Sequence, residues 1–105
     1  MTQQTERMKQ IETLLADDPK DEFLRYGLAM EYLAQKEDDT ALKLLQELVK
    51  DSAYPPAYLQ AGQIATRTGQ IDLARLLFQQ GVAIAQTQGN HHAADEMTRF
   101  LEALE

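Results

Sequence analysis

The sequence contains no cysteine and no tryptophan, and each absence excludes something. Without thiols, the chain has no disulfides, no thiolate nucleophile and no cysteine-based metal site. Aromatic residues make up only 7% of the 105 residues, so we expect a core built mainly from Leu, Ile, Val and Ala. Proline and glycine are also few, with three and five copies, and this composition favours helix over disorder.

No apolar run approaches the length of a transmembrane helix. The first ten residues, MTQQTERMKQ, also lack the apolar stretch of a signal peptide. We therefore expect a cytoplasmic protein with no membrane partner, unless a signal outside this sequence directs export.

Basic residues are in deficit. The chain has ten Lys and Arg residues and seventeen Asp and Glu residues, which gives a net charge of -7. Residues 1–52 contain seven of the basic residues and twelve of the acidic residues, a balance of -5. An acidic chain without a basic stripe is a poor candidate for binding nucleic acid or an anionic membrane. We interpret the charge as a contribution to solubility.

What the sequence does contain is an internal repeat with a period of thirty-three residues. The recurring residues are Asp39, Ala41, Leu44, Gln46 and Val49, which return as Asp72, Ala74, Leu77, Gln79 and Val82. A fixed period in the low thirties, carried on helical sequence, is typical of stacked helix pairs. Such arrays usually form binding surfaces rather than catalytic sites.

Apolar residues recur at helical spacing in six segments, at about 2–16, 20–35, 40–50, 57–68, 71–87 and 90–104. The first helix is expected to begin near Thr2. Particular residues are expected to set the helix boundaries. Asp18 is expected to cap the second helix, with Pro19 at its first position, and Asp38 or Asp39 is expected to cap the third. Pro55-Pro56 should start the fourth helix, Gly69 should end it in a left-handed conformation, and Asn90 should cap the sixth. Because no useful alternation with period two occurs, the sequence predicts an all-α protein.

Several positions match the pattern of one known family. Small residues stand midway along the first helix of each pair, and an alanine and a large apolar residue follow in the second. The matching residues are Ala29 and Gly62, Tyr32, Lys36 and Gly69 in the turns, Ala41 and Ala74, and Leu45 and Phe78. Over about residues 20–87 the chain resembles the tetratricopeptide repeat (TPR) family. It departs from the pattern at Ala65 and Leu48, and it lacks a proline after the second repeat.

The resemblance implies a TPR-like α-solenoid of antiparallel helix pairs, with about six helices in a right-handed superhelical stack. The implied organisation is a single TPR-like domain over residues 1–105. It consists of an N-terminal capping helix (1–18), two repeats (20–52 and 53–87) and a C-terminal capping helix (90–105). A generic helical bundle is the alternative fold. Capping helices are expected because a solenoid needs polar outer faces at its two ends.

No catalytic or cofactor constellation is evident. His91 and His92 are adjacent, so on a helix they point about 100° apart and cannot act as one pair of metal ligands. Ser52 has no histidine nearby in sequence, and the glycines are scattered rather than grouped in a phosphate loop. We therefore predict no enzymatic activity, no cofactor and no metal.

In TPR-like proteins, the first helices of the pairs line a concave groove. Spacing assigns to that groove four residues from each repeat: Phe23, Tyr26, Met30 and Leu33, then Leu59, Gln63, Thr66 and Arg67. This mixture suits a peptide or a partner helix, with Arg67 as a candidate to hold a carboxylate. The expected function is a non-catalytic scaffold that binds a protein or peptide partner. The alternative is a self-association module that forms a homodimer without a separate ligand, and packing of Phe23 and Leu33 against neighbouring helices also remains open.

Overall fold

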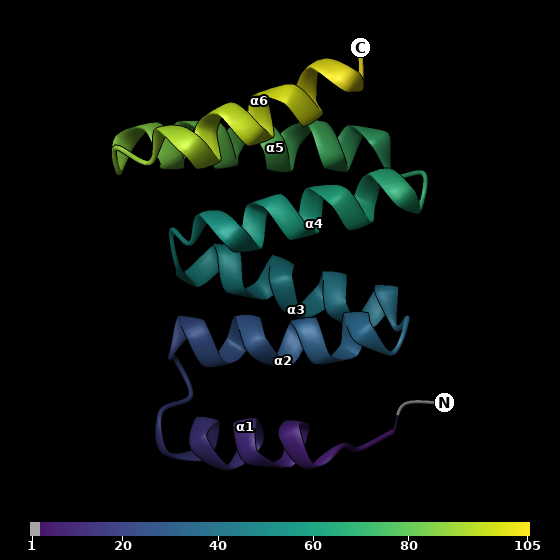
Figure 1. Ribbon diagram of the computed structural model, residues 1–105, viewed down its shortest axis with the longest axis vertical. Coiled ribbons are helices and arrows are strands. Elements are labelled where there is room, and N and C mark those ends of the chain that lie inside the picture. Colours follow the sequence, from purple (N-terminus) through teal and green to yellow (C-terminus); the bar gives the residue numbers. More distant parts are fainter. Residues whose placement is uncertain (1–2) are drawn as a thin grey trace. The chain divides into compact units, whose positions relative to one another are not determined.

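The computed structural model describes residues 3–105, and within that range the chain forms six α-helices and no β-strand (Figure 1). The helices are α1 (Glu6–Asp17), α2 (Glu22–Ala34), α3 (Asp38–Asp51), α4 (Pro55–Arg67), α5 (Ile71–Thr87) and α6 (His91–Ala103). The prediction of an all-α fold is therefore confirmed. No helix in the described range is both long and apolar enough to cross a membrane.

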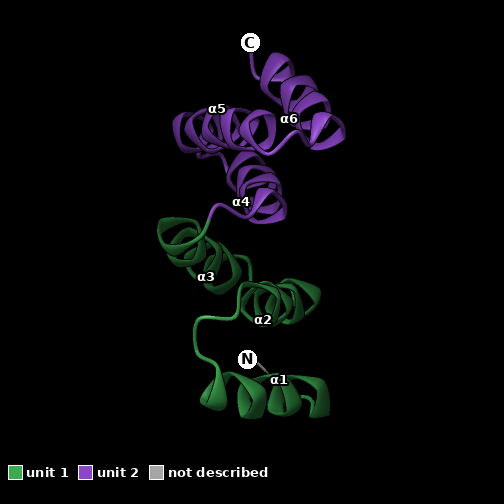
Figure 2. Cartoon of the chain, turned by 90° about the vertical axis from the view of Figure 1, so that its left-hand side faces the viewer, with its two compact units in different colours: residues 1–52 green, residues 53–105 purple. Residues whose placement is uncertain are grey.

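The chain divides into two compact units, residues 1–52 and residues 53–105, which Figure 2 shows in different colours. In the first unit α2 packs against both α1 and α3. In the second unit α5 packs against both α4 and α6, and α4 also contacts α6. The division falls between Ser52 and Ala53, where the two predicted repeats meet.

Side-chain caps begin two helices of the first unit. The predicted start at Thr2 lies outside the described residues, and α1 begins at Glu6 because the Thr5 hydroxyl accepts a hydrogen bond from the backbone N–H of Met8, 3.1 Å away. The prediction that Pro19 opens α2 was wrong. Pro19 instead lies in a turn in which Asp21 N–H donates to Asp18 C=O, and the Asp21 carboxylate caps the helix by accepting from Leu24 N–H.

The turns between paired helices use left-handed backbone. Gly69 has φ +80°, as predicted for the residue after α4, and Lys36 has φ +61° at the matching place after α2. The predicted cap at Asp38 or Asp39 was wrong, because α3 already begins at Asp38 and its N-cap is Glu37, without a side-chain hydrogen bond. Both aspartates therefore lie in the first turn, where their negative charge interacts favourably with the helix dipole.

The buried core of the first unit consists of apolar side chains from all three helices: Met8, Ile11, Ala29, Ala41, Leu42, Leu45 and Leu48. Leu14, an apolar residue of α1, is 53% exposed. It is adjacent to half-buried Leu15 and therefore turned about 100° away from that residue around the helix.

The second unit is centred on Phe78, which is fully buried. A Cβ added to Gly62 of α4 would lie 2.6 Å from Phe78 Cζ and 2.8 Å from Phe78 Cδ1, so the ring fills the space that a side chain would need. The small residue midway along α4 is therefore the place where α4 and α5 approach closely. On α6, the ring of Phe100 stacks on Phe78 with 5.6 Å between centroids and 10° between planes. One aromatic side chain of α5 thereby contacts both other helices of its unit.

Candidate functional site

Three of the four groove residues predicted on α2 line one hollow, which we call the α2 hollow. It has a volume of about 320 Å³ and is lined by Arg7, Ile11, Phe23, Leu24, Tyr26, Gly27, Met30 and Glu31. Phe23, Tyr26 and Met30 are spaced three and four apart, so they share a face of the helix. Leu33 does not line the hollow.

Phe23 gives the α2 hollow its most exposed apolar side chain. It is 72% exposed, whereas Tyr26 and Met30 are half-buried. The fully exposed residues of a monomer are usually polar, and an exposed aromatic ring beside a hollow is typical of a contact surface. The alternative in which Phe23 is simply packed against neighbouring helices does not fit this exposure.

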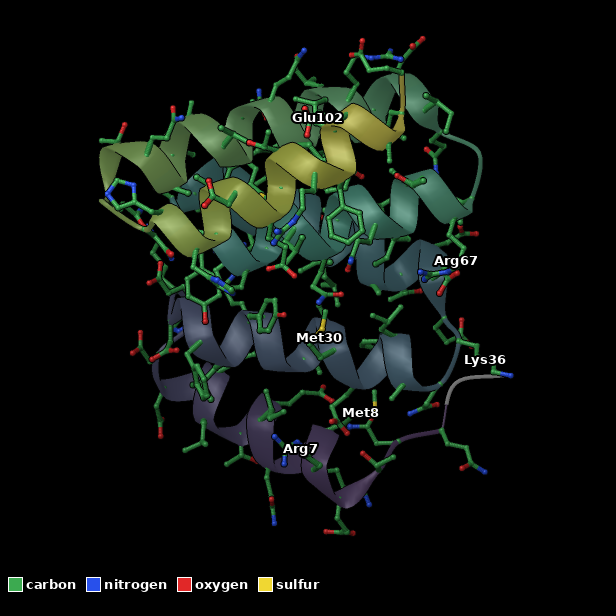
Figure 3. The ribbon with its side chains drawn as sticks, turned by 45° about the horizontal axis from the view of Figure 1, so that its top comes forward. Arg7, Met8, Met30, Lys36, Arg67 and Glu102 are labelled. Carbon is green, nitrogen blue, oxygen red and sulfur yellow. The ribbon has the colours of Figure 1, made fainter. Side chains whose placement is uncertain are left out.

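An ion pair forms the charged part of the wall. Arg7 Nε of α1 lies 3.1 Å from Glu31 Oε2 of α2, with side-chain exposures of 72% for Arg7 and 22% for Glu31. Figure 3 labels Arg7 and Met30, which belong to these two helices. Sequence spacing could not find Arg7 or Ile11, because they come from a different helix and meet α2 only in the folded unit.

Three of the four groove residues predicted on α4 line a second hollow, the α4 hollow. Its volume is about 410 Å³, and its lining residues are Gln63, Thr66, Arg67, Phe100, Ala103 and Leu104. Leu59 does not line it. Its α4 side is polar, with one amide, one hydroxyl and one guanidinium group, whereas its other side is apolar. Figure 3 labels Arg67 near the C-terminal end of α4.

The apolar wall of the α4 hollow comes from the C-terminal part of α6. Phe100, Ala103 and Leu104 were not predicted as site residues. Phe100 is half-buried, because it stacks on Phe78 and also borders the hollow. The only local signal was the apolar spacing of Met97, Phe100 and Leu104, which by itself indicates nothing beyond helix packing.

The polar side chains of α4 that line the α4 hollow differ in exposure. The Thr66 hydroxyl donates to the Gly62 carbonyl 2.8 Å away, so it satisfies its own helix. Gln63 is half-buried, whereas Thr66 and Arg67 are exposed near the end of the helix. A ligand on this surface would therefore reach Thr66 and Arg67 more readily than Gln63.

No metal-binding geometry occurs among residues 3–105, since no three His, Asp or Glu side chains there lie close enough to hold an ion. His91 and His92 are exposed at the start of α6, where the Asn90 side chain caps Ala93 N–H as predicted. Burial raises the pKa of the Tyr58 phenol above its ordinary value. Tyr58 contributes to the core of the second unit and lines neither hollow.

Two antiparallel helix pairs, α2–α3 and α4–α5, each closed by a turn with one left-handed residue, are the units of a helical repeat protein. The family model "Tetratricopeptide repeat" matches residues 1–57. The chain is also 33% identical over 96 residues to the TPR repeat-containing protein PA0015 of Pseudomonas aeruginosa, an alignment that covers 90% of this chain and 91% of that protein. The chain therefore belongs to the tetratricopeptide repeat family.

Solved structures support the same fold. A tetratricopeptide repeat domain protein from Salinibacter ruber has a TM-score of 0.78 at 32% identity, with 83% of this chain and 89% of that chain covered. The protein BPP2914 from Bordetella parapertussis has a TM-score of 0.76 at 28% identity, with 92% and 85% covered. The predicted TPR-like fold is confirmed. Folds of this family generally mediate protein–protein interaction, and the family is generally non-catalytic.

Proposed function

We propose that this chain is a non-catalytic, cytoplasmic scaffold that binds a peptide or helix of a protein partner, and that α2 and α4 each present a candidate binding surface in their own unit. The observation that carries the proposal is the exposed ring of Phe23 at the edge of the α2 hollow, with Tyr26 and Met30 beside it. The family's general role in protein interaction supports the proposal, but it does not specify this surface.

The α2 hollow would supply most of the affinity. Fully burying a phenylalanine side chain is favourable by about 1.5–3 kcal/mol. Most of the Phe23 side chain is exposed, so a partner could still bury it. A hollow that already exists on packed helices needs little ordering when a ligand enters it. We therefore expect an apolar side chain of the partner to pack against Phe23 and Met30.

The α4 hollow is the second candidate surface, and its polar groups would orient a ligand. Gln63 can both donate and accept hydrogen bonds, and Arg67 can hold a carboxylate or a peptide carbonyl. Phe100 and Leu104 offer an apolar floor for the part of the partner next to that polar group. The C-terminal helix thus contributes to the proposed surface.

A phage-displayed library of random peptides, selected on the full chain, tests this function. We expect the enriched peptides to bind Phe23→Ala at least about tenfold more weakly, the loss typical of a central contact residue. Leu76→Ala is the matched control, because Leu76 is an apolar residue 49% exposed on α5 that lines neither hollow. If no peptide is enriched, or if Phe23→Ala binds as well as wild type, the proposed surface is wrong.

Self-association is the second candidate function, and the exposure of Leu14 favours it. This side chain borders a shallow surface hollow of about 550 Å³ on α1, together with Gln10 and Thr13. A second copy could bury it. Static light scattering decides, because a mass that stays monomeric at every concentration would exclude the homodimer. Leu14→Ala would lower the association if this face is used.

A further inference from the structure

The α2 hollow combines an apolar floor with a carboxylate that is shielded from water. Phe23, Leu24, Met30 and Ile11 supply the apolar part. Glu31 stands beside them with a side chain only 22% exposed. A carboxylate held at such a place attracts a cation more strongly than one in bulk water, since nearby protein atoms reduce dielectric screening.

The cation that now satisfies Glu31 is itself weakly held. Arg7 reaches across from α1 and keeps 72% of its side chain in solvent. Exposed ion pairs of this kind contribute little to stability, because holding a long side chain in place costs conformational freedom. A carboxylate also has about four lone-pair sites, so Glu31 can exchange Arg7 for another cation or accept a second one.

The net charge of the first unit also favours a cationic ligand. Residues 1–52 carry seven Lys and Arg against twelve Asp and Glu, which leaves a balance of -5. Two of these cations besides Arg7 pair with acidic residues of the same unit, Lys9 with Glu6 and Arg25 with Asp51. A partner that approaches this unit therefore meets an excess of negative charge, which raises the association rate of a positive segment.

We propose that the α2 hollow recognises a cationic amphipathic helix of a protein partner, in which an apolar side chain packs on Phe23 and a neighbouring Lys or Arg pairs with Glu31. This inference rests on the binding role proposed above and specifies its ligand. The incoming cation competes with Arg7 for the Glu31 carboxylate. Arg7 is therefore a residue that weakens binding of the cationic ligand, and its removal improves the site.

Three synthetic amphipathic helices test the inference. They share one leucine face and carry Lys, Gln or Glu on the polar face, and fluorescence anisotropy measures their dissociation constants for the full chain. We expect the Lys peptide to bind most tightly and the Glu peptide most weakly. Glu31→Gln should weaken the Lys peptide about fivefold and leave the Gln peptide unchanged, as for a partly shielded ion pair.

The charge variants of α1 provide the matched control. Arg7→Ala should tighten the Lys peptide about threefold, because the competing cation is lost. Lys9→Ala removes the same charge from the same helix, but Lys9 pairs with Glu6 and does not line the α2 hollow. It should leave the affinity within the error of wild type. Circular dichroism checks that every variant remains helical.

Each contrary outcome overturns a different statement. If Lys9→Ala tightens binding as much as Arg7→Ala, the attraction depends on net charge and the assignment of Glu31 is wrong. If the Lys and Gln peptides bind equally and Phe23→Ala abolishes both, the hollow binds peptides without the proposed preference for cations. If none of the three peptides binds, the proposed use of the α2 hollow falls, and the inference falls with it.

Discussion

The most informative perturbation of this fold is a single added methyl group, Gly62→Ala. The new Cβ would lie 2.6 Å from Phe78 Cζ and 2.8 Å from Phe78 Cδ1, well inside van der Waals contact. The ring has little room to move, because it is fully buried and the ring of Phe100 is stacked on it. Either α4 must shift away from α5 or the aromatic stack must break.

Two effects of opposite sign set the magnitude. Alanine is favoured over glycine inside a helix by about 0.5–1 kcal/mol. Overpacking a filled core costs about 1–3 kcal/mol. The net expectation is a loss of about 1 kcal/mol, within a range of about 0–2.5 kcal/mol, and each kcal/mol corresponds to about 4–8 °C in melting temperature for a domain of this size.

Urea denaturation followed by circular dichroism measures the change, and Gly27→Ala is the matched control. A Cβ at Gly27 would meet only Ile11 Cδ1, at 3.7 Å, which is ordinary contact. Gly27→Ala should therefore stabilise the protein by about 0.5–1 kcal/mol through helix propensity alone. The two glycine variants should shift the midpoint in opposite directions.

A second substitution isolates the cause. Phe78→Leu removes Cε1 and Cζ, the two ring atoms nearest to the new methyl group, so Gly62→Ala should cost about 1 kcal/mol less in that background than in wild type. The proposed crossing is refuted if Gly62→Ala raises the midpoint as Gly27→Ala does. It is equally refuted if Gly62→Ala costs the same in the Phe78→Leu background as in wild type, since the two changes would then be independent.

Three further sets of substitutions concern turns, caps and pH. Lys36→Gly should stabilise the protein to urea by about 0.5–1 kcal/mol because Lys36 has φ +61°, whereas Gly69→Ala at φ +80° should destabilise it by about 1 kcal/mol. Asn90→Ala removes the acceptor of Ala93 N–H, so it should cost about 1 kcal/mol and speed hydrogen exchange in the first turn of α6. The pKa of Tyr58 is raised by burial above 10.0, so the unfolded phenol loses its proton first as pH rises. Stability should be unaffected below pH 10 and should fall as pH rises through the folded pKa, and Tyr58→Phe should reduce this fall in urea midpoint.

The sequence predicted helix ends well where only one nearby residue could end or cap the helix. Gly69 can adopt the left-handed region, and Asn90 can cap, so the predicted α5 of 71–87 is the observed Ile71–Thr87. The start of α2 failed because Asp18 and Asp21 can both cap a helix. Only the folded turn, with Asp21 N–H bonded to Asp18 C=O at 3.2 Å, selects between them.

The hollows could be predicted only in part, because each has walls from two helices. Periodicity identifies the exposed face of one helix, and it grouped Phe23 with Tyr26 and Met30. The periodicity of one helix does not show which residues of another helix form the opposite wall of the hollow. The end of α6 borders the later turns of α4, at Gln63 and Arg67, and Leu59 lies one turn before them. No local pattern in α4 contains that information.

The internal repeat and the two hollows together explain why the chain varies where it does. Residues that match between the repeats include Ala41 and Ala74, both fully buried, where a larger side chain would separate the helices. Their equivalents in the first helices diverge, and Met30 is replaced by Gln63 thirty-three residues later. Met30 lines the α2 hollow and Gln63 lines the α4 hollow, so packing constrains neither position as fully as it constrains the alanines. The same divergence makes one hollow apolar with a shielded carboxylate and the other polar with a guanidinium. The two surfaces would therefore select different side chains, and substitutions in one should not mimic substitutions in the other.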